Sequence, residues 1–303
     1  MEKNSNRRES AFPRDKFFLA LEMYKHWGSV EPPDLTYIIG TFTPRVDKIE
    51  DGMHFLEGMS GIPRDIFIGL SLGDKSFLSN FYEKVRGFQN VELFGAAGPV
   101  SVYDVACFLK GHEYQGELSV VDVSEFPLKA TIPYIDRGVF GLRGDQFDLV
   151  HGSVLDLDQQ SCVDLIFADV LSLYLSPEDL NRLAIKVAQR LNSGGLYITR
   201  DLVEPNGPPL YRKSGVSGQV DNCKLQNFIL ENFEIDITPS EIQNRQDNLW
   251  SGNCAFSRAS LDECTTPFLK AGLQLRQSIP ITSQPLYETE NPRIFYVNVF
   301  GKE

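Results

Sequence analysis

The sequence lacks the features that mark a membrane, secreted or nucleic-acid-binding protein. It has no run of about 18 apolar residues that could span a bilayer. Its polar start, MEKNSNRRES, has no apolar stretch of the kind that a secretory signal requires. Basic residues are outnumbered, with 29 Lys+Arg against 41 Asp+Glu and a net charge of −12. Because binding to nucleic acid phosphates needs clustered basic side chains, we expect no nucleic-acid partner. Because both kinds of apolar segment are missing, we expect a cytoplasmic protein with no membrane partner.

Cysteine is also scarce, and its spacing excludes the usual uses of the residue. None of the five cysteines forms a C-x-x-C pair, and their number is odd. Disulfide frameworks and structural zinc sites need paired or closely spaced cysteines. We therefore expect free thiols and no metal.

The remaining composition is typical of a globular protein. Apolar residues make up 42% and charged residues 23% of the 303 residues. This length allows one large domain, or one domain with an appendage. It is sufficient to bury a substantial core.

From residue 90 onward, short apolar runs alternate with helical stretches. This rhythm is typical of βαβ units and predicts an α/β fold with a mostly parallel sheet. The last two strands are joined by turn-forming residues, so we expect them to be antiparallel to each other. The predicted strands cover residues 91–94, 117–123, 147–150, 163–168, 196–199, 273–281 and 293–300.

The best-defined helix begins after Ser176. Ser176 and Asp179 form a capping box, and Pro177 suits the first turn. Apolar residues that recur at helical spacing predict one buried face. These residues are Leu180, Leu183, Ala184, Val187 and Leu191. We expect Gly194 and Gly195 to end the helix.

Two further segments flank the predicted sheet. Residues 1–80 predict an N-terminal helical cap, with one helix at 15–27 and another at 76–86. Residues 205–257 are polar and too long for a simple connection, so we interpret them as an insertion or lid. The sheet domain would then comprise residues 81–204 and 258–303.

Candidate ligand-binding residues follow four predicted strands. Ligands of open α/β sheets bind at the carboxyl ends of the strands. One candidate is the Gly-rich turn that contains Gly95, Ala96 and Gly98, because glycine lets a ligand approach the backbone. Another is Asp122, because a carboxylate can accept both hydroxyls of a ribose.

The other two candidates follow later strands. The segment containing Ser153 and Val154 could read the edge of an adenine with its backbone and short polar side chains. Ala168 and Asp169 end the next strand, where Asp169 could face the ligand crevice.

This order resembles the class I S-adenosylmethionine-dependent methyltransferases over roughly residues 80–204 and 258–303. The resemblance rests on VELFGAAGPV, LSVVDVS, HGSVLDL, the long stretch from VDLIFADV to GGLYIT, and the closing pair LQLRQSIPI and RIFYVNVF. It implies a Rossmann-like, seven-stranded, mostly parallel sheet with an antiparallel closing strand. It also implies S-adenosylmethionine as the cofactor.

The resemblance also implies roles for particular residues. The glycine loop (Gly95, Ala96 and Gly98) would approach the methionine part of the cofactor, with Glu92 as the nearby acidic residue. Asp122, followed by Val123, would hold the ribose. Ser153 and Val154 would flank the adenine, and Ala168 and Asp169 would line the methyl donor.

The implied activity is methyl transfer to a small molecule. Proximity and orientation supply most of the acceleration of such a reaction, so a strong acid–base motif is not required and no catalytic residue is assigned. The acceptor pocket would come from residues 1–80 and 203–257. The candidate pocket residues are Tyr24, Tyr211 and Trp250, aromatic side chains suited to contact a sulfonium.

Other functions remain open at this point. An enzyme that transfers the aminocarboxypropyl group of S-adenosylmethionine, or cyclises this cofactor, would use the same binding residues. A module that has lost catalysis could also keep the fold. A nicotinamide-dependent oxidoreductase is disfavoured, because no tyrosine is followed four residues later by lysine. The oligomeric state stays open, a homodimer included.

Overall fold

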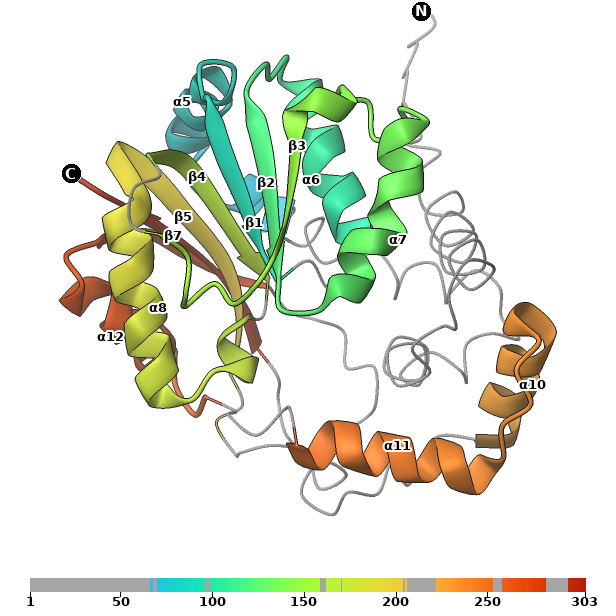
Figure 1. Cartoon of the computed structure of the whole chain (residues 1–303). Coiled ribbons are helices and arrows are strands. Elements are labelled where there is room, and N and C mark those ends of the chain that lie inside the picture. Colours follow the sequence, from blue (N-terminus) through green and yellow to red (C-terminus); the bar gives the residue numbers. More distant parts are fainter. Residues whose placement is uncertain are drawn as a thin grey trace, which may run out of the picture.

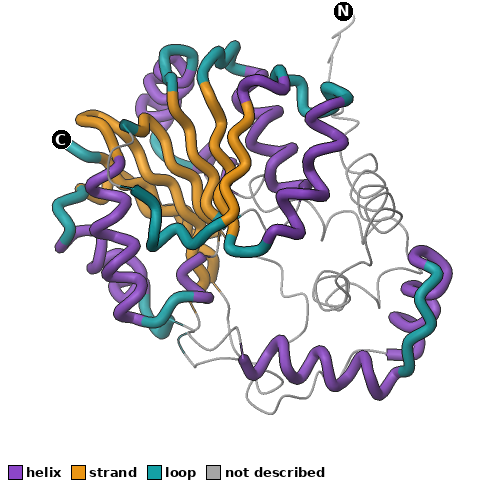
Figure 2. The backbone as a smooth tube through the Cα atoms, viewed as in Figure 1, coloured by secondary structure: helices purple, strands orange, loops and turns teal. Residues whose placement is uncertain are grey.

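The computed structural model describes residues 66–67, 70–95, 99–158, 162–169, 171–203, 205, 222–252, 258–281 and 294–303. The helix expected at 15–27, most of the predicted N-terminal cap, and Tyr24, Ala96, Gly98 and Tyr211 lie outside these residues. The described part is a sheet with helices packed on both faces, as Figures 1 and 2 show.

The described strands form one seven-stranded sheet in the order β3-β2-β1-β4-β5-β7-β6. Neighbours from β3 to β5 are parallel, and β7 is antiparallel to both β5 and β6. Six strands therefore run in one direction and β7 runs against them, which confirms the predicted fold class. The bounds are β1 Asn90–Phe94, β2 Glu117–Asp122, β3 Phe147–His151, β4 Val163–Asp169, β5 Leu191–Val203, β6 Gln274–Ile281 and β7 Ile294–Gly301.

The helices cover the two faces of the sheet separately. Core residues of α5 (Lys75–Val85), α6 (Pro99–Gly111) and α7 (Glu125–Asp136) pack on one face, and those of α8 (Pro177–Arg190) and α12 (Leu261–Lys270) pack on the other. Side chains alternate between faces along a strand. In β4, Phe167 accordingly joins the first core and Ile166 the second. The helix α5 confirms the one predicted at 76–86, whereas α7 was not predicted, because Pro127 and Pro133 obscure its pattern.

The start of α8 is as predicted, but its end is not. Ser176 caps the helix by accepting a 3.0 Å hydrogen bond from the Asp179 amide. The expectation that Gly194 and Gly195 end the helix was wrong. The helix ends at Arg190, because Leu191 is already extended and pairs with Val163 of β4. Gly194 has a positive φ of 77° but lies within β5.

The segment between β5 and α12 contains two described helices, α10 (Asn222–Phe233) and α11 (Pro239–Gly252). Val203 and Arg258 form a parallel bridge at its two ends. The chain thus leaves the sheet and returns to it at neighbouring residues. The use of this segment as a lid stays a prediction. Within the described residues, no helix is both long and apolar enough to cross a membrane.

Candidate functional site

The carboxyl ends of β1, β2 and β3 are joined by main-chain hydrogen bonds. The Gly95 amide donates to the Val121 carbonyl, and the Gly152 amide donates to the Asp122 carbonyl, each at 2.9 Å. Three predicted segments therefore meet at one edge of the sheet. These are the start of the glycine turn, the acidic residue Asp122 that ends β2 and the loop after β3.

Gly95 adopts a conformation that favours glycine. Its φ is +72°, in the left-handed region that other L residues seldom adopt. A Cβ at this position would also lie 3.5 Å from Cδ1 of Leu171. Leu171 begins the short helix η3 (Leu171–Tyr174), which follows β4. Gly95 therefore lies beside the residue that begins η3.

Asp122 is the acidic group at the centre of this edge. Its side chain is mostly buried, and its Oδ1 accepts a 2.7 Å hydrogen bond from the Ser124 amide. This bond fixes the orientation of the carboxyl group at the end of β2. The next residue, Val123, is 75% exposed, and its carbonyl lies 3.2 Å from Nε2 of His151. An acidic group and an apolar side chain therefore stand together at the strand end.

The loop after β3 begins beside Asp122. Its first turn closes when the Asp156 amide donates to the Ser153 carbonyl at 2.9 Å, and the Ser153 hydroxyl accepts from the Leu155 amide at 3.2 Å. The side chain of Val154 packs into the core on the α8 face. At Gly152, an added Cβ would meet no atom of the described residues within 4 Å. The backbone at Gly152 is therefore approachable.

Glu92 has a partner that sequence analysis did not anticipate. We expected a cofactor contact, but both carboxylate oxygens are bound by the guanidinium of Arg190, with Nε 3.0 Å from Oε2. Both side chains are buried. A buried carboxylate needs a compensating charge, and the end of α8 supplies it. Glu92 thus forms a buried ion pair between β1 and α8, and its contact with a cofactor stays a prediction.

Asp169, at the end of β4, also forms a buried ion pair. Its Oδ1 lies 2.8 Å from Nε of Arg200, its neighbour in the register of β4 and β5. The Arg200 guanidinium lies over the Phe295 ring, 4.6 Å from its centroid. Ala168 is fully buried. Arg200 was not among the predicted site residues, although a charged residue directly after the run LYIT was a signal for it.

Sequence analysis also missed a buried polar cluster on the opposite face. Asn298 donates to the carboxylate of Asp201 at 2.8 Å and accepts from Ser278 at 2.7 Å. Burial raises the pKa of Asp201, and the nearby charge of Arg258 opposes this rise. Arg258 also donates to the carbonyls of Ser172 and Leu175. Arg258, where the chain returns to the sheet, therefore holds η3 in place.

Among the residues that the structure describes, no three His, Cys, Asp or Glu side chains are grouped so that they could hold a metal ion. Trp250 lies in α11, but its side chain is not among those described.

Comparisons with known proteins gave structural neighbours only. No family model and no curated protein matches the sequence. One neighbour is the N-methyltransferase NodS from Bradyrhizobium japonicum WM9 in complex with S-adenosyl-L-homocysteine, at 12% identity and a TM-score of 0.43, covering 74% of this chain and 84% of that one. Another is a putative sarcosine dimethylglycine methyltransferase from Galdieria sulphuraria, at 13% identity and a TM-score of 0.49, covering 79% and 86%.

A third neighbour is a putative S-adenosylmethionine-dependent methyltransferase from Listeria monocytogenes, at 13% identity and a TM-score of 0.47, covering 74% and 97%. The strand order and strand directions of this chain are those that the sequence resemblance implied. The chain therefore has the fold of the class I S-adenosylmethionine-dependent methyltransferases.

Proposed function

We propose that this protein is an S-adenosylmethionine-dependent methyltransferase that acts on a small molecule. The observation that carries the proposal is the pair of hydrogen bonds that join Gly95 to β2 and Gly152 to Asp122. They bring three segments with cofactor-binding chemistry to one edge of a sheet with this fold, which is where ligands of open α/β sheets bind.

The residues at this edge fit an adenosine-containing cofactor. The Asp122 carboxylate has two oxygens that can accept the ribose hydroxyls, while Ser124 fixes its orientation. The open backbone at Gly152, with Ser153 next to it, suits a flat adenine edge. Gly95 presents a backbone without a side chain to the methionine part. Val123 offers an exposed apolar side chain beside Asp122.

When bound, the cofactor supplies an electrophilic methyl group on its sulfonium. The protein's part is to bind, to orient and to exclude water, because alignment of donor and acceptor supplies most of the acceleration. Ala168 and Asp169 would form the wall beside the donor. The ion pair with Arg200 holds the Asp169 carboxylate in place, and the positive charge of Arg200 balances the negative charge of Asp169.

The proposed acceptor is a small molecule. A net charge of −12 disfavours a polyanionic acceptor such as nucleic acid. Residues 205–257 would cover the acceptor as a lid, and Tyr24, Tyr211 and Trp250 are proposed to line its pocket.

Thermal unfolding with S-adenosylmethionine, S-adenosylhomocysteine, NAD and NADP tests the cofactor. A ligand at 100 times its Kd that binds only the folded state adds about 2.7 kcal/mol of stability, so Tm should rise with the first two and not with the nicotinamides. No rise with either sulfur ligand would contradict the proposal and favour a binding module without catalysis. Product analysis then separates methyl transfer, which yields S-adenosylhomocysteine, from aminocarboxypropyl transfer, which yields methylthioadenosine.

A further inference from the structure

The basic residues of α8 contact the loop after β3 one after another. Arg182, Lys186 and Arg190 are four residues apart, so they lie along one side of the helix. Arg182 lies 3.8 Å from the carboxylate of Asp156. Lys186 donates from Nζ to the Leu157 carbonyl at 2.5 Å, and Arg190 donates from Nη1 to the Asp158 carbonyl. The loop thus follows the helix for two turns.

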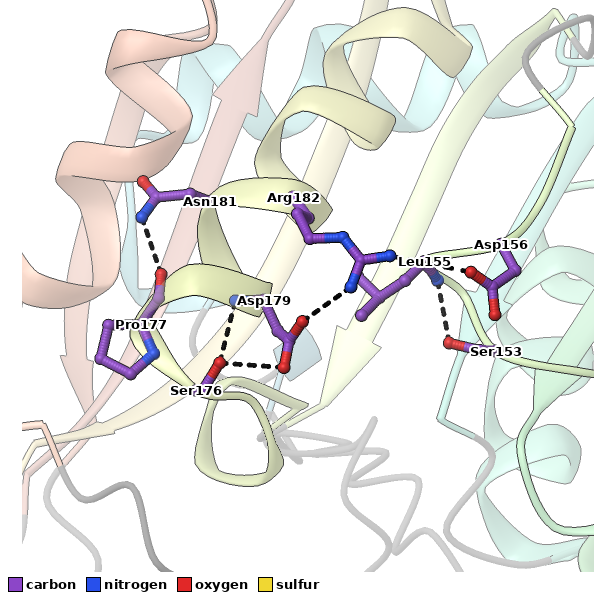
Figure 3. A network of polar contacts seen from close by, with 8 residues as sticks. All are labelled: Ser153, Leu155, Asp156, Ser176, Pro177, Asp179, Asn181 and Arg182. Atoms are coloured by element: carbon purple, nitrogen blue, oxygen red, sulfur yellow. Dashed lines mark hydrogen bonds and ion pairs between the residues drawn. The ribbon is translucent and has the colours of Figure 1, made fainter.

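The first of these contacts is continuous with the helix cap. Figure 3 shows the Arg182 guanidinium between Asp179 and Asp156. Asp179 binds Arg182 at 2.9 Å and also accepts a 2.9 Å hydrogen bond from Ser176. The N-terminus of α8 and the first turn of the loop are therefore linked by polar side chains. Arg182 and Asp156 are exposed, so their ion pair contributes little.

The deeper contacts are directed at the main chain of the loop. The Leu157 carbonyl is bonded by Lys186, which is partly buried, and the Asp158 carbonyl is bonded by Arg190, which is buried. Arg190 also binds Glu92 in β1. Residues 157 and 158 are thereby fixed to the helix and, through Arg190, to the strand that leads into Gly95.

The start of the loop, at Gly152, is fixed to Asp122. The Gly152 amide donates to the Asp122 carbonyl, and the Val154 side chain is buried in the core. Residues 152–158 are therefore held at their first and last positions. A segment held in this way loses little conformational freedom when a ligand binds, so less of the binding free energy is spent on ordering it.

We propose that Lys186 is a positioning residue for the adenosine part of the cofactor. It acts through the loop, because its bond to the Leu157 carbonyl keeps Gly152 and Ser153 beside Asp122. This inference rests on the proposed function. Arg190 reinforces the position of the loop, but its buried pair with Glu92 makes it a poor residue for a test.

The test compares three variants of the full chain. Lys186→Met removes the donor and keeps the aliphatic stem, and Lys186→Arg restores a donor. Lys270→Met makes the same change at an exposed lysine in the last turn of α12 and is the matched control. Two quantities are measured: amide hydrogen exchange of a peptide that covers residues 150–158 in the ligand-free protein, and calorimetric affinity for S-adenosylhomocysteine.

We expect Lys186→Met to speed exchange in this peptide and to weaken binding by about three- to tenfold, as the loss of about one hydrogen bond predicts. Lys186→Arg should recover most of both, and Lys270→Met should change neither. A purely structural lysine would lower Tm without changing the affinity of the folded protein.

Three outcomes would overturn the inference, and they are distinguishable. Unchanged exchange means that Lys186 does not hold the loop. Faster exchange with unchanged affinity means that the loop does not serve the cofactor, and the proposed function stands. Failure of the unmodified protein to bind S-adenosylhomocysteine overturns the proposed function and, with it, this role for Lys186.

Discussion

The main-chain carbonyl of Asp122 accepts a 2.9 Å hydrogen bond from the amide of Gly152. This bond continues the pairing of β2 and β3 by one residue beyond Asp122 and His151. It places an oriented carboxyl group next to a backbone without a side chain. Two of the predictions below depend on this pair.

Replacement of Asp122 should weaken cofactor binding. We expect Asp122→Ala to cost about 1.5–3 kcal/mol of affinity for S-adenosylmethionine, the range for hydrogen bonds to a charged group. Asp122→Asn keeps an oxygen that can accept the hydrogen bond from the Ser124 amide. A loss of affinity in this variant would therefore come from contact with the ligand and not from loss of the local bond. Calorimetric titration gives the affinities, with Asp145→Asn as an exposed control. Unchanged affinity in folded Asp122→Ala would refute the ribose assignment.

Gly152→Ala should weaken binding without loss of stability. The added methyl group meets no described atom within 4 Å, and the φ of Gly152 is not in the left-handed region. Stability should therefore stay equal or rise by about 0.4–1 kcal/mol, because alanine restricts the unfolded chain. A ligand that lies against Gly152 would clash with the methyl group. Urea unfolding and titration with S-adenosylhomocysteine measure the two effects, and full affinity would place the ligand elsewhere.

Removal of one partner of the Glu92–Arg190 pair should be strongly destabilising. Arg190→Met leaves a buried carboxylate without its counter-charge, which costs about 3–5 kcal/mol. The double variant Glu92→Met/Arg190→Met removes both charges and should recover most of this loss. The exposed pair Arg86–Glu113 offers a control, since Arg86→Met should cost about 1 kcal/mol or less. Equal losses at the two sites in urea unfolding would contradict a buried pair.

Asp201 should make the stability of the protein depend on pH. Burial raises its pKa above the ordinary 3.8. Between pH 3.8 and the raised pKa, the folded state therefore binds a proton that the unfolded state has lost. Its contribution to the free energy of unfolding therefore falls as pH rises from about 4 through the raised pKa. Asp201→Asn cannot titrate and should lack this fall. Unfolding of both proteins at several pH values measures the difference, and parallel curves would contradict the raised pKa.

Local patterns along the chain predict the order and type of most elements. Apolar runs of four to eight residues and the Ser176 capping box depend on local chemistry, which acts in the same way before and after folding. For the same reason the strand ends that carry Gly95, Asp122 and Gly152 could be named in advance. Boundaries were less well determined, and β5 begins at Leu191 because pairing with Val163 outweighs the local signal of Gly194.

Long-range packing determines which polar and charged side chains meet. Glu92 and Arg190 are 98 residues apart, and Asn298 and Asp201 are 97 apart. No pattern along the chain relates them, because a buried charge takes its partner from whatever element packs against it. The contacts of α8 with the loop after β3 arose in the same way. Local patterns thus predicted which groups lie at one edge of the sheet, whereas long-range packing paired Glu92 with Arg190 and brought Lys186 to the Leu157 carbonyl.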